Sequence, residues 1–131
     1  MKVLETALVS YYNSNMVYSP KPKLYNTKAP KRALFPYITF NQISGVPENA
    51  LRRKKIESFL YQFNIFSAEE SVVELNNIFE DLKTVFDNCT LIVVGYNFID
   101  MDREISRKDE IEIKAQIIWK YTIQYRIKIN D

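Results

Sequence analysis

Residues 111–127 read IEIKAQIIWKYTIQYRI, and this stretch decides the fold. Apolar side chains occupy every odd position, while every even position except Ile118 is polar. Successive side chains of a β-strand point to opposite faces, so the pattern predicts one long strand with an apolar face and a wet face. A helical period of 3.6 would scatter the same isoleucines around the whole circumference, which argues against a helix.

The length of this predicted strand suggests that the protein assembles with others. Seventeen residues extend over about 55 Å, whereas a compact domain of 131 residues is only about 36 Å across. The strand must therefore bend strongly or project beyond the body of the protein. A projecting half-apolar strand is costly in water and becomes stable when neighbouring copies cover it. We therefore expect an assembly component.

The first half of the chain predicts a helix followed by loops and strands. Residues 2–13 carry apolar side chains at helical spacing. All five prolines fall between positions 20 and 47, which indicates loop and edge strand, with a short edge strand at residues 16–18. Residues 35–43 and 57–66 are rich in aromatic and β-branched side chains, and we expect them to pair as antiparallel strands. Alternation in the second predicts one apolar face, made by Phe59, Tyr61, Phe63 and Ile65.

The second half predicts one more helix and two strands. Ser67 and Glu70 have the spacing of a capping box, and the apolar side chains that follow recur every three or four positions up to residues 87–88. The apolar stripe of this helix consists of Val72, Leu75, Ile78, Phe79, Leu82, Val85 and Phe86. We expect a strand at 91–101 and a charged connection at 102–109 before the long strand. The whole sequence thus predicts a single α+β domain over residues 1–131. It would contain an antiparallel sheet of about four to five strands, two helices packed on one face and a long C-terminal strand.

Composition limits the possible functions. The chain is 47% hydrophobic and has a formal charge of +2, which is typical of a folded protein and does not by itself favour nucleic acid. Its apolar runs are too short to cross a bilayer, and the N-terminal residues lack a signal-peptide core, so we expect no membrane partner. There are no histidines and one cysteine, Cys89, which excludes Ser-His and Cys-His catalysis and a structural zinc site. We expect no cofactor and no enzymatic activity.

One arrangement nevertheless resembles an enzyme site. Asp100 and Asp102 precede Glu112-Ile113-Lys114, and acidic residues facing Glu-x-Lys on the next strand are similar to the metal site of restriction-type nucleases. The alternative is that strand alternation alone places charged residues at 112 and 114. A small Mg²⁺-dependent nuclease or DNA-binding module is therefore the second hypothesis.

Two charged segments are candidate interfaces. The densest basic run is Arg52-Arg53-Lys54-Lys55, which suits DNA phosphates or an acidic protein surface but also suits a solvated loop. The predicted connection at 102–109 contributes Arg103, Arg107 and Lys108, either for solubility or for a polar contact with a neighbouring subunit.

The order of the predicted elements and several short sequence segments resemble those of the tail-completion, or tail-terminator, proteins of long-tailed bacteriophages and related tail-like particles. The matching pieces are the opening helix, Ala29-Pro30 before residues 35–40 (FPYITF), residues 61–67 (YQFNIFS) running into a helix, and the last strand with Trp119 and residues 125–127 (YRI). The likeness spans nearly the whole chain and rests on order and spacing.

The resemblance implies a structural role in head–tail joining. Members of this family form a ring, commonly a hexamer, that terminates the tail tube and joins it to the head connector or head-closure protein. The resemblance therefore implies the tube protein and the connector as partners, DNA in the lumen as a non-specific contact, and a place in the tail or neck of the virion after assembly in the host cytoplasm. The family has no catalytic residues to carry over.

Overall fold

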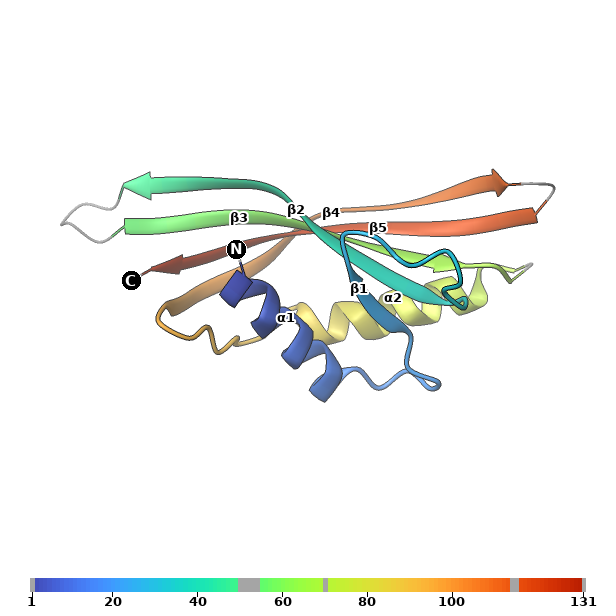
Figure 1. The fold of residues 1–131 in the computed structure, drawn as a ribbon, viewed down its shortest axis with the longest axis horizontal. Coiled ribbons are helices and arrows are strands. Elements are labelled where there is room, and N and C mark those ends of the chain that lie inside the picture. Colours follow the sequence, from blue (N-terminus) through green and yellow to red (C-terminus); the bar gives the residue numbers. More distant parts are fainter. Residues whose placement is uncertain (1, 50–54, 70, 114–115, 131) are drawn as a thin grey trace.

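The computed structural model describes residues 2–49, 55–69, 71–113 and 116–130, with side chains described for all of these except 46–49, 55, 112 and 113. A five-stranded sheet carries two helices on one face (Figure 1). The elements are α1 (Lys2–Asn15), β1 (Lys23–Asn26), β2 (Tyr37–Asn49), β3 (Lys55–Ser67), α2 (Val73–Phe86), β4 (Asn97–Ile113) and β5 (Gln116–Asn130). The strand order is β1-β2-β3-β5-β4; β1 is parallel to β2, and the other neighbours are antiparallel. The α+β fold with a long C-terminal strand is confirmed.

The prediction of one strand over residues 111–127 is wrong, because the stretch folds into a hairpin. β4 ends at Ile113, β5 begins at Gln116, and these two residues are paired. Paired residues share a face, so between Ile105 and Ile113 the odd positions of β4 lie on the same side of the sheet as the even positions of β5. Because Ile113 pairs with Gln116, the alternation in the sequence continues from one strand to the next, and the Lys-Ala between them in the sequence is not typical of turns.

The hairpin also explains the interruption of the pattern at Ile118. This residue pairs with Ile111 on the face away from the helices and is 7% exposed, whereas Ile117 is 46% exposed. Further along β5 the odd positions do face the helices, and Ile123, Tyr125, Ile127 and Ile129 are fully buried.

The boundaries around β4 also differ from the prediction. Residues 102–109, expected to be a connection, lie in the middle of β4, which forms one edge of the sheet. Charged side chains are a common protection for an edge strand, so their density does not mark a loop. Residues 91–96, expected to be strand, are a loop in which Leu91 and Val93 are buried.

Two further predictions, of the second edge strand and of the residue that caps α2, are wrong. The other edge strand is β1, at Lys23–Asn26, and not residues 16–18. Ser67 does not cap α2: it ends β3, and its hydroxyl lies 2.7 Å from Oε1 of Glu74 in the first turn of a helix that begins at Val73. Glu70, the other half of the expected capping box, lies outside the described residues.

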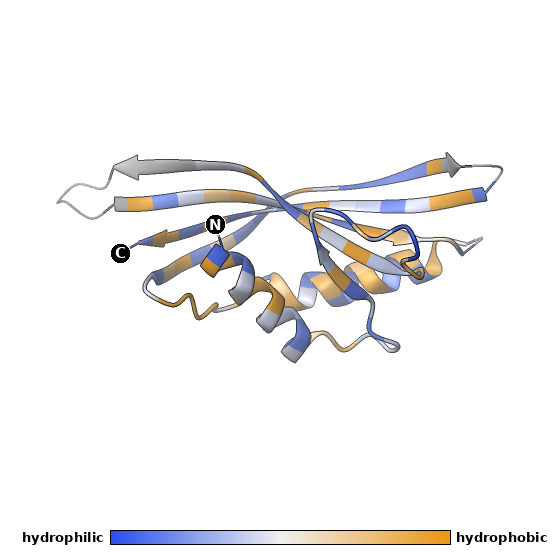
Figure 2. Cartoon of the chain, in the orientation of Figure 1, coloured by the Kyte–Doolittle hydropathy of each residue, from blue (hydrophilic) through white to orange (hydrophobic). Residues whose placement is uncertain are grey.

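An aromatic core joins the helices to the sheet. The rings of Phe63 and Phe86 are 5.0 Å apart between centroids, and Tyr125 packs edge-on against both. The predicted apolar face of β3 is confirmed, since its odd residues from Phe59 to Ile65 are at most 8% exposed. Figure 2 shows hydrophobic colour along the helices and the strands that they cover. Beyond this body, the β2–β3 and β4–β5 pairs extend toward opposite ends of the molecule (Figure 1).

Candidate assembly interfaces

The face of the sheet opposite the helices carries a closed network of polar side chains. Thr39, Asn64 and Thr122 lie side by side on β2, β3 and β5, and each is at most 7% exposed. Asn64 Nδ2 donates to Thr39 Oγ1 at 3.4 Å, and Thr122 Oγ1 donates to Asn64 Oδ1 at 3.2 Å. Gln62 and Gln124 extend the network through bonds of 3.0 Å. Because these groups satisfy one another, this face is polar and ordered without any added ligand.

Arg103, Arg107 and Lys108, the three candidate interface cations within residues 102–109, do not all lie on the same face of the sheet. Arg103 points to the helix side, where its guanidinium lies 3.6 Å from Asp87, the residue that ends α2. Lys108 also reaches the helix layer, because its Nζ donates to Asn76 Oδ1 at 3.5 Å. Arg107 lies on the opposite face, 3.1 Å from Asp109, and its side chain is 71% exposed. Arg107 is therefore more accessible than Arg103.

The basic run at residues 52–55 remains a prediction. Arg52, Arg53 and Lys54 lie outside the described residues, and Lys55 is described only by its backbone, as the first residue of β3. In the sequence the run follows β2, which ends at Asn49, and reaches the first residue of β3. The β2–β3 pair itself extends beyond the helices at one end of the molecule (Figure 1).

The geometry does not assemble the proposed nuclease site. Asp100, Asp102 and Glu112 all lie on β4, and the ten residue steps of strand from Asp102 to Glu112 correspond to about 33 Å. Instead of Glu112, the residues opposite Asp100 and Asp102 on β5 are Lys128 and Arg126. Lys114 lies outside the described residues, and within the described part of the chain no three acidic or cysteine side chains come together as metal ligands.

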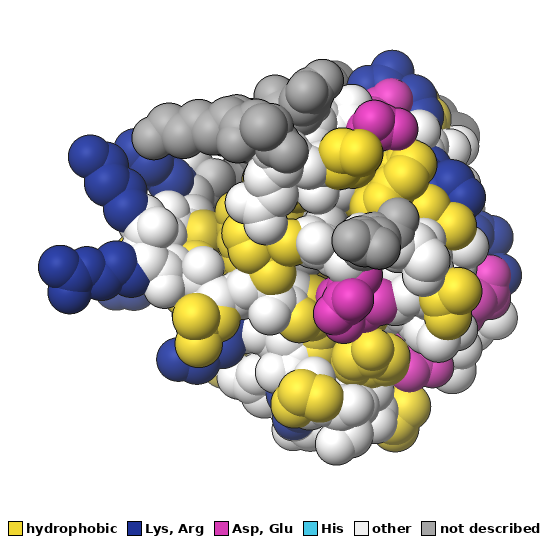
Figure 3. Space-filling view, turned by 90° about the vertical axis from the view of Figure 1, so that its right-hand side faces the viewer, with side chains coloured by type: hydrophobic (Ala, Val, Ile, Leu, Met, Phe, Trp, Pro, Cys, Tyr) yellow, Lys and Arg dark blue, Asp and Glu magenta, His cyan; other side chains and the backbone are white. Residues whose placement is uncertain are grey.

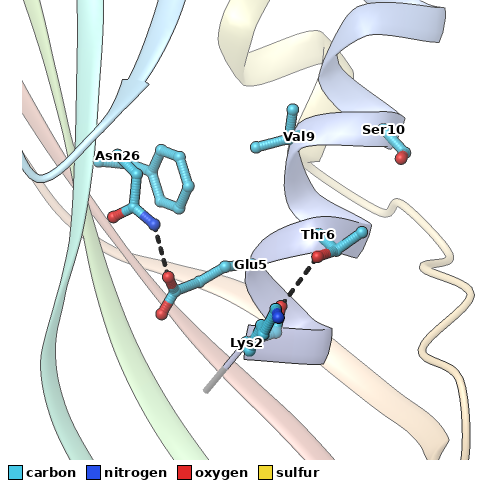
Figure 4. A pocket seen from close by; sticks show the side chains of 7 residues that line it. Lys2, Glu5, Thr6, Val9, Ser10 and Asn26 are labelled. Carbon is cyan, nitrogen blue, oxygen red and sulfur yellow. Dashed lines mark hydrogen bonds between the residues drawn. The ribbon is translucent and has the colours of Figure 1, made fainter.

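A carboxylate does line a pocket between α1 and the sheet, but it has a structural role. Glu5 accepts a hydrogen bond of 2.6 Å from Asn26 Nδ2 (Figure 4) and one of 3.0 Å from the hydroxyl of Tyr61. Burial alone would raise the pKa of Glu5, yet the hydrogen bonds that it accepts outweigh burial and hold that pKa below its ordinary value. The ionised side chain thereby fastens α1 to β1 and β3.

Two apolar features at the surface escaped the sequence analysis. One is a pocket of about 480 Å³ around residues 20–36, beside which Leu34 is 84% exposed. The other is the loop after α2, where Ile92 is 86% and Val94 is 77% exposed. The prolines of the first had indicated only loop, and the apolar run of the second had indicated a strand. The sequence pattern shows which residues are apolar, but it does not show that Leu34, Ile92 and Val94 remain exposed in the folded subunit.

The fold is similar to that of known solved structures over nearly its whole length. One is a chain of the structure described as "Virion of native gene transfer agent (GTA) particle", with a TM-score of 0.74, 9% sequence identity and coverage of 97% of each chain. A second solved protein, which carries no functional description, matches with a TM-score of 0.59 and 9% identity over 96% of this chain and 94% of its own. No protein-family model matches the sequence, and a search of curated proteins finds no match.

Proposed function

We propose that this chain is a structural protein of a phage or phage-like particle that forms a ring at the head-proximal end of the tail tube. The observation that carries the proposal is the fold shared, over 97% of both chains, with a protein of a gene transfer agent virion. The finer role follows from the resemblance to tail-terminator proteins. In this role the ring, a hexamer in that family, ends the tail and joins it to the head connector.

The shape of the subunit suits a ring. The β2–β3 and β4–β5 pairs extend beyond the helices toward opposite ends, so a copy has strand surfaces to offer on both sides (Figure 1). β4 is an edge strand of 17 residues, with an outer edge open to another chain. Contacts between different surfaces of identical subunits generate rings when the rotation per subunit closes.

The partners differ between the two faces of such a ring. One face would contact the tube protein and the other the head-closure or connector protein, while the basic run at residues 52–55 would face one of them or the DNA in the passage. Such charged contacts steer docking and set its salt dependence. The chain would act in the tail or neck of the particle after assembling in the host cytoplasm, without a catalytic step of its own.

Imaging of assembled particles tests the proposal. The gene is deleted and complemented with a chain that carries a small epitope, and the particles are purified and examined by electron cryomicroscopy. We expect symmetric ring density at the junction of head and tail, and unjoined heads and tails in the deletion. Absence of the chain from purified particles, or a single asymmetric copy in them, would contradict the proposal.

A further inference from the structure

We infer that neighbouring copies of this chain join head to tail, with the loop after α2 of one subunit seated in the proline-lined pocket of the next. This inference rests on the proposed ring and names the contact that builds it. Two surfaces of the same molecule carry the argument, called here the knob (residues 91–95) and the socket (residues 20–36).

The knob is held rigidly in a shape that presents two apolar side chains to solvent. Leu91 and Val93 are 2% and 4% exposed, so alternate residues anchor the loop to the core. Tyr96 N–H donates to Val93 O at 3.1 Å and closes a turn in which Gly95 has a φ of +84°, a conformation that favours glycine. Ile92 and Val94 between these anchors are 86% and 77% exposed. Nothing within the described subunit uses them, and their exposure costs free energy until another surface covers them.

The socket is apolar and equally well fixed. Its walls include four prolines and two aromatic rings: Pro20, Pro22, Pro30, Pro36, Tyr25 and Phe35. Each proline locks its own φ, so little conformational entropy remains to be lost when an apolar side chain enters. Leu34 also lines this pocket, and 84% of its surface is exposed to solvent in the subunit.

The charges around the two surfaces are complementary. The socket is lined by three cations, Lys21, Lys23 and Arg32, and by no carboxylate. Figure 3, a view onto one end of the molecule, shows Lys and Arg side chains projecting from one side and others along the opposite edge. At the base of the knob a shallow polar hollow is lined by Asp87, Asn88, Met101, Asp102 and Arg103, which leaves one negative charge in excess. Opposite charges around the two apolar surfaces favour a contact between the knob and the socket over a contact between two sockets, whose like charges would repel.

The positions of the knob and the socket fit a ring. They lie toward opposite ends of the long axis of the subunit, on the layer that contains the helices (Figure 1). One subunit therefore cannot bring its own knob to its own socket. A line of copies can satisfy every knob and every socket, and it leaves none uncovered once the line closes.

Disulfide trapping in assembled particles tests the contact. The double variant Leu34→Cys/Ile92→Cys is built in a Cys89→Ala background, so that residue 92 has no nearby native thiol. Because a disulfide requires Cα atoms within about 7 Å, we expect a ladder of linked multimers after mild oxidation. Each single cysteine variant, and the pair Val17→Cys/Ile92→Cys with a similarly exposed partner, should give unlinked chains.

The outcomes separate this inference from the proposed function. Particles that contain the chain at normal level but yield only unlinked chains, or a link from residue 34 to a different virion protein, would overturn the inference and leave the ring intact. Absence of the wild-type chain from particles would overturn the proposed function itself.

A second variant guards against loss of folding in the cysteine proteins. Ile92→Ser changes an exposed side chain, so we expect an unchanged midpoint of thermal unfolding but a particle yield lower by about tenfold or more, because every subunit contact in the ring loses its apolar side chain. The control Val17→Ser removes an apolar group that is 74% exposed, and we expect a normal yield. Normal yield from Ile92→Ser would contradict the inference.

Discussion

The hydroxyl of Tyr125 donates a hydrogen bond of 2.7 Å to Oδ1 of Asp87, and so joins the buried centre of β5 to the end of α2. The other oxygen of the same carboxylate, Oδ2, lies 3.6 Å from the guanidinium of Arg103 on β4. One side chain at the end of a helix thus holds both strands of the last hairpin.

Removal of the Tyr125 hydroxyl should weaken this junction. We expect Tyr125→Phe to lower the free energy of unfolding by about 1–2 kcal/mol, because the lost bond goes to a charged acceptor that water can partly solvate. Urea unfolding measures the change. Tyr11→Phe is the matched control, since the half-buried Tyr11 packs through its ring, 6.2 Å from that of Phe86. Equal losses in both variants would show that the hydroxyl bond contributes nothing.

Three buried tyrosines should make the protein sensitive to alkali. Burial raises the pKa of Tyr12, Tyr61 and Tyr125 above the ordinary value of 10.0. A group with a raised pKa stabilises the fold fully below its unfolded pKa and loses that contribution as the pH rises above it. We therefore expect the free energy of unfolding to fall above about pH 9, by about 1.4 kcal/mol per pH unit for each of these tyrosines well above pH 10.

A tyrosine variant isolates one part of this pH dependence. Tyr12→Phe removes the bond of 2.6 Å to Pro22 O, so the variant starts at a lower free energy of unfolding. Above pH 10, its free energy of unfolding should nevertheless fall less steeply with pH than that of the wild type, by about 1.4 kcal/mol per pH unit, because one titrating tyrosine is missing. Unfolding in urea at intervals from pH 8 to 11 gives both quantities, and identical slopes would refute the assignment.

Two isoleucines on β5 test which part of the strand is core. Ile123 is fully buried, so we expect Ile123→Ala to cost about 2–5 kcal/mol. Ile117, six residues earlier and 46% exposed, undergoes the same chemical change in Ile117→Ala, and there we expect less than about 1 kcal/mol. A single continuous strand with a buried odd face would predict similar losses at both positions, so urea unfolding of the pair distinguishes the two arrangements.

The sequence predicted the parts of the fold that depend on periodicity. Leu75, Ile78, Phe79 and Leu82 were correctly assigned to the buried side of a helix, and Phe59 to Ile65 to the buried side of a strand, because burial of one face imposes these spacings. The reversal of the chain between Ile113 and Gln116 escaped prediction because pairing across a hairpin preserves alternation. A lysine and an alanine also lack the backbone preferences that mark turns.

The candidate interfaces were harder to predict for a different reason. The cations Arg103 and Lys108 looked like free surface charge, yet tertiary pairing brings them to Asp87 and Asn76. The exposed Ile92 looked like part of a strand core, because the sequence reports hydrophobicity and not whether a neighbour covers it. Exposure is a property of the whole fold, so it became visible only with all elements in place.

We expect no metal-dependent cleavage of DNA. Asp102 and Glu112 are separated by about 33 Å of β4, far beyond the few ångströms over which carboxylates share a metal ion. Purified protein incubated with supercoiled plasmid and Mg²⁺ or Mn²⁺ should leave it intact, and Lys114→Ala should behave as the wild type. Nicking that disappears in Lys114→Ala would restore the nuclease hypothesis.

The last prediction concerns the basic run between β2 and β3. Arg52→Glu/Arg53→Glu changes the formal charge from +2 to −2, since each substitution shifts it by two units. We expect folding to survive, because the substitutions fall in the connection between two strands and leave the aromatic core untouched. Joining of heads to tails should fall steeply and the two parts should accumulate separately, because reversed charges repel the surface or the DNA that the run would contact. The control Lys2→Glu/Lys83→Glu makes the same change of charge at two lysines outside the run, the knob and the socket, and there we expect normal joining. Electron microscopy of lysates counts joined and unjoined particles. Equal joining in the two double variants would mean that residues 52–55 are a solvated connection and that the contacts of the ring lie elsewhere.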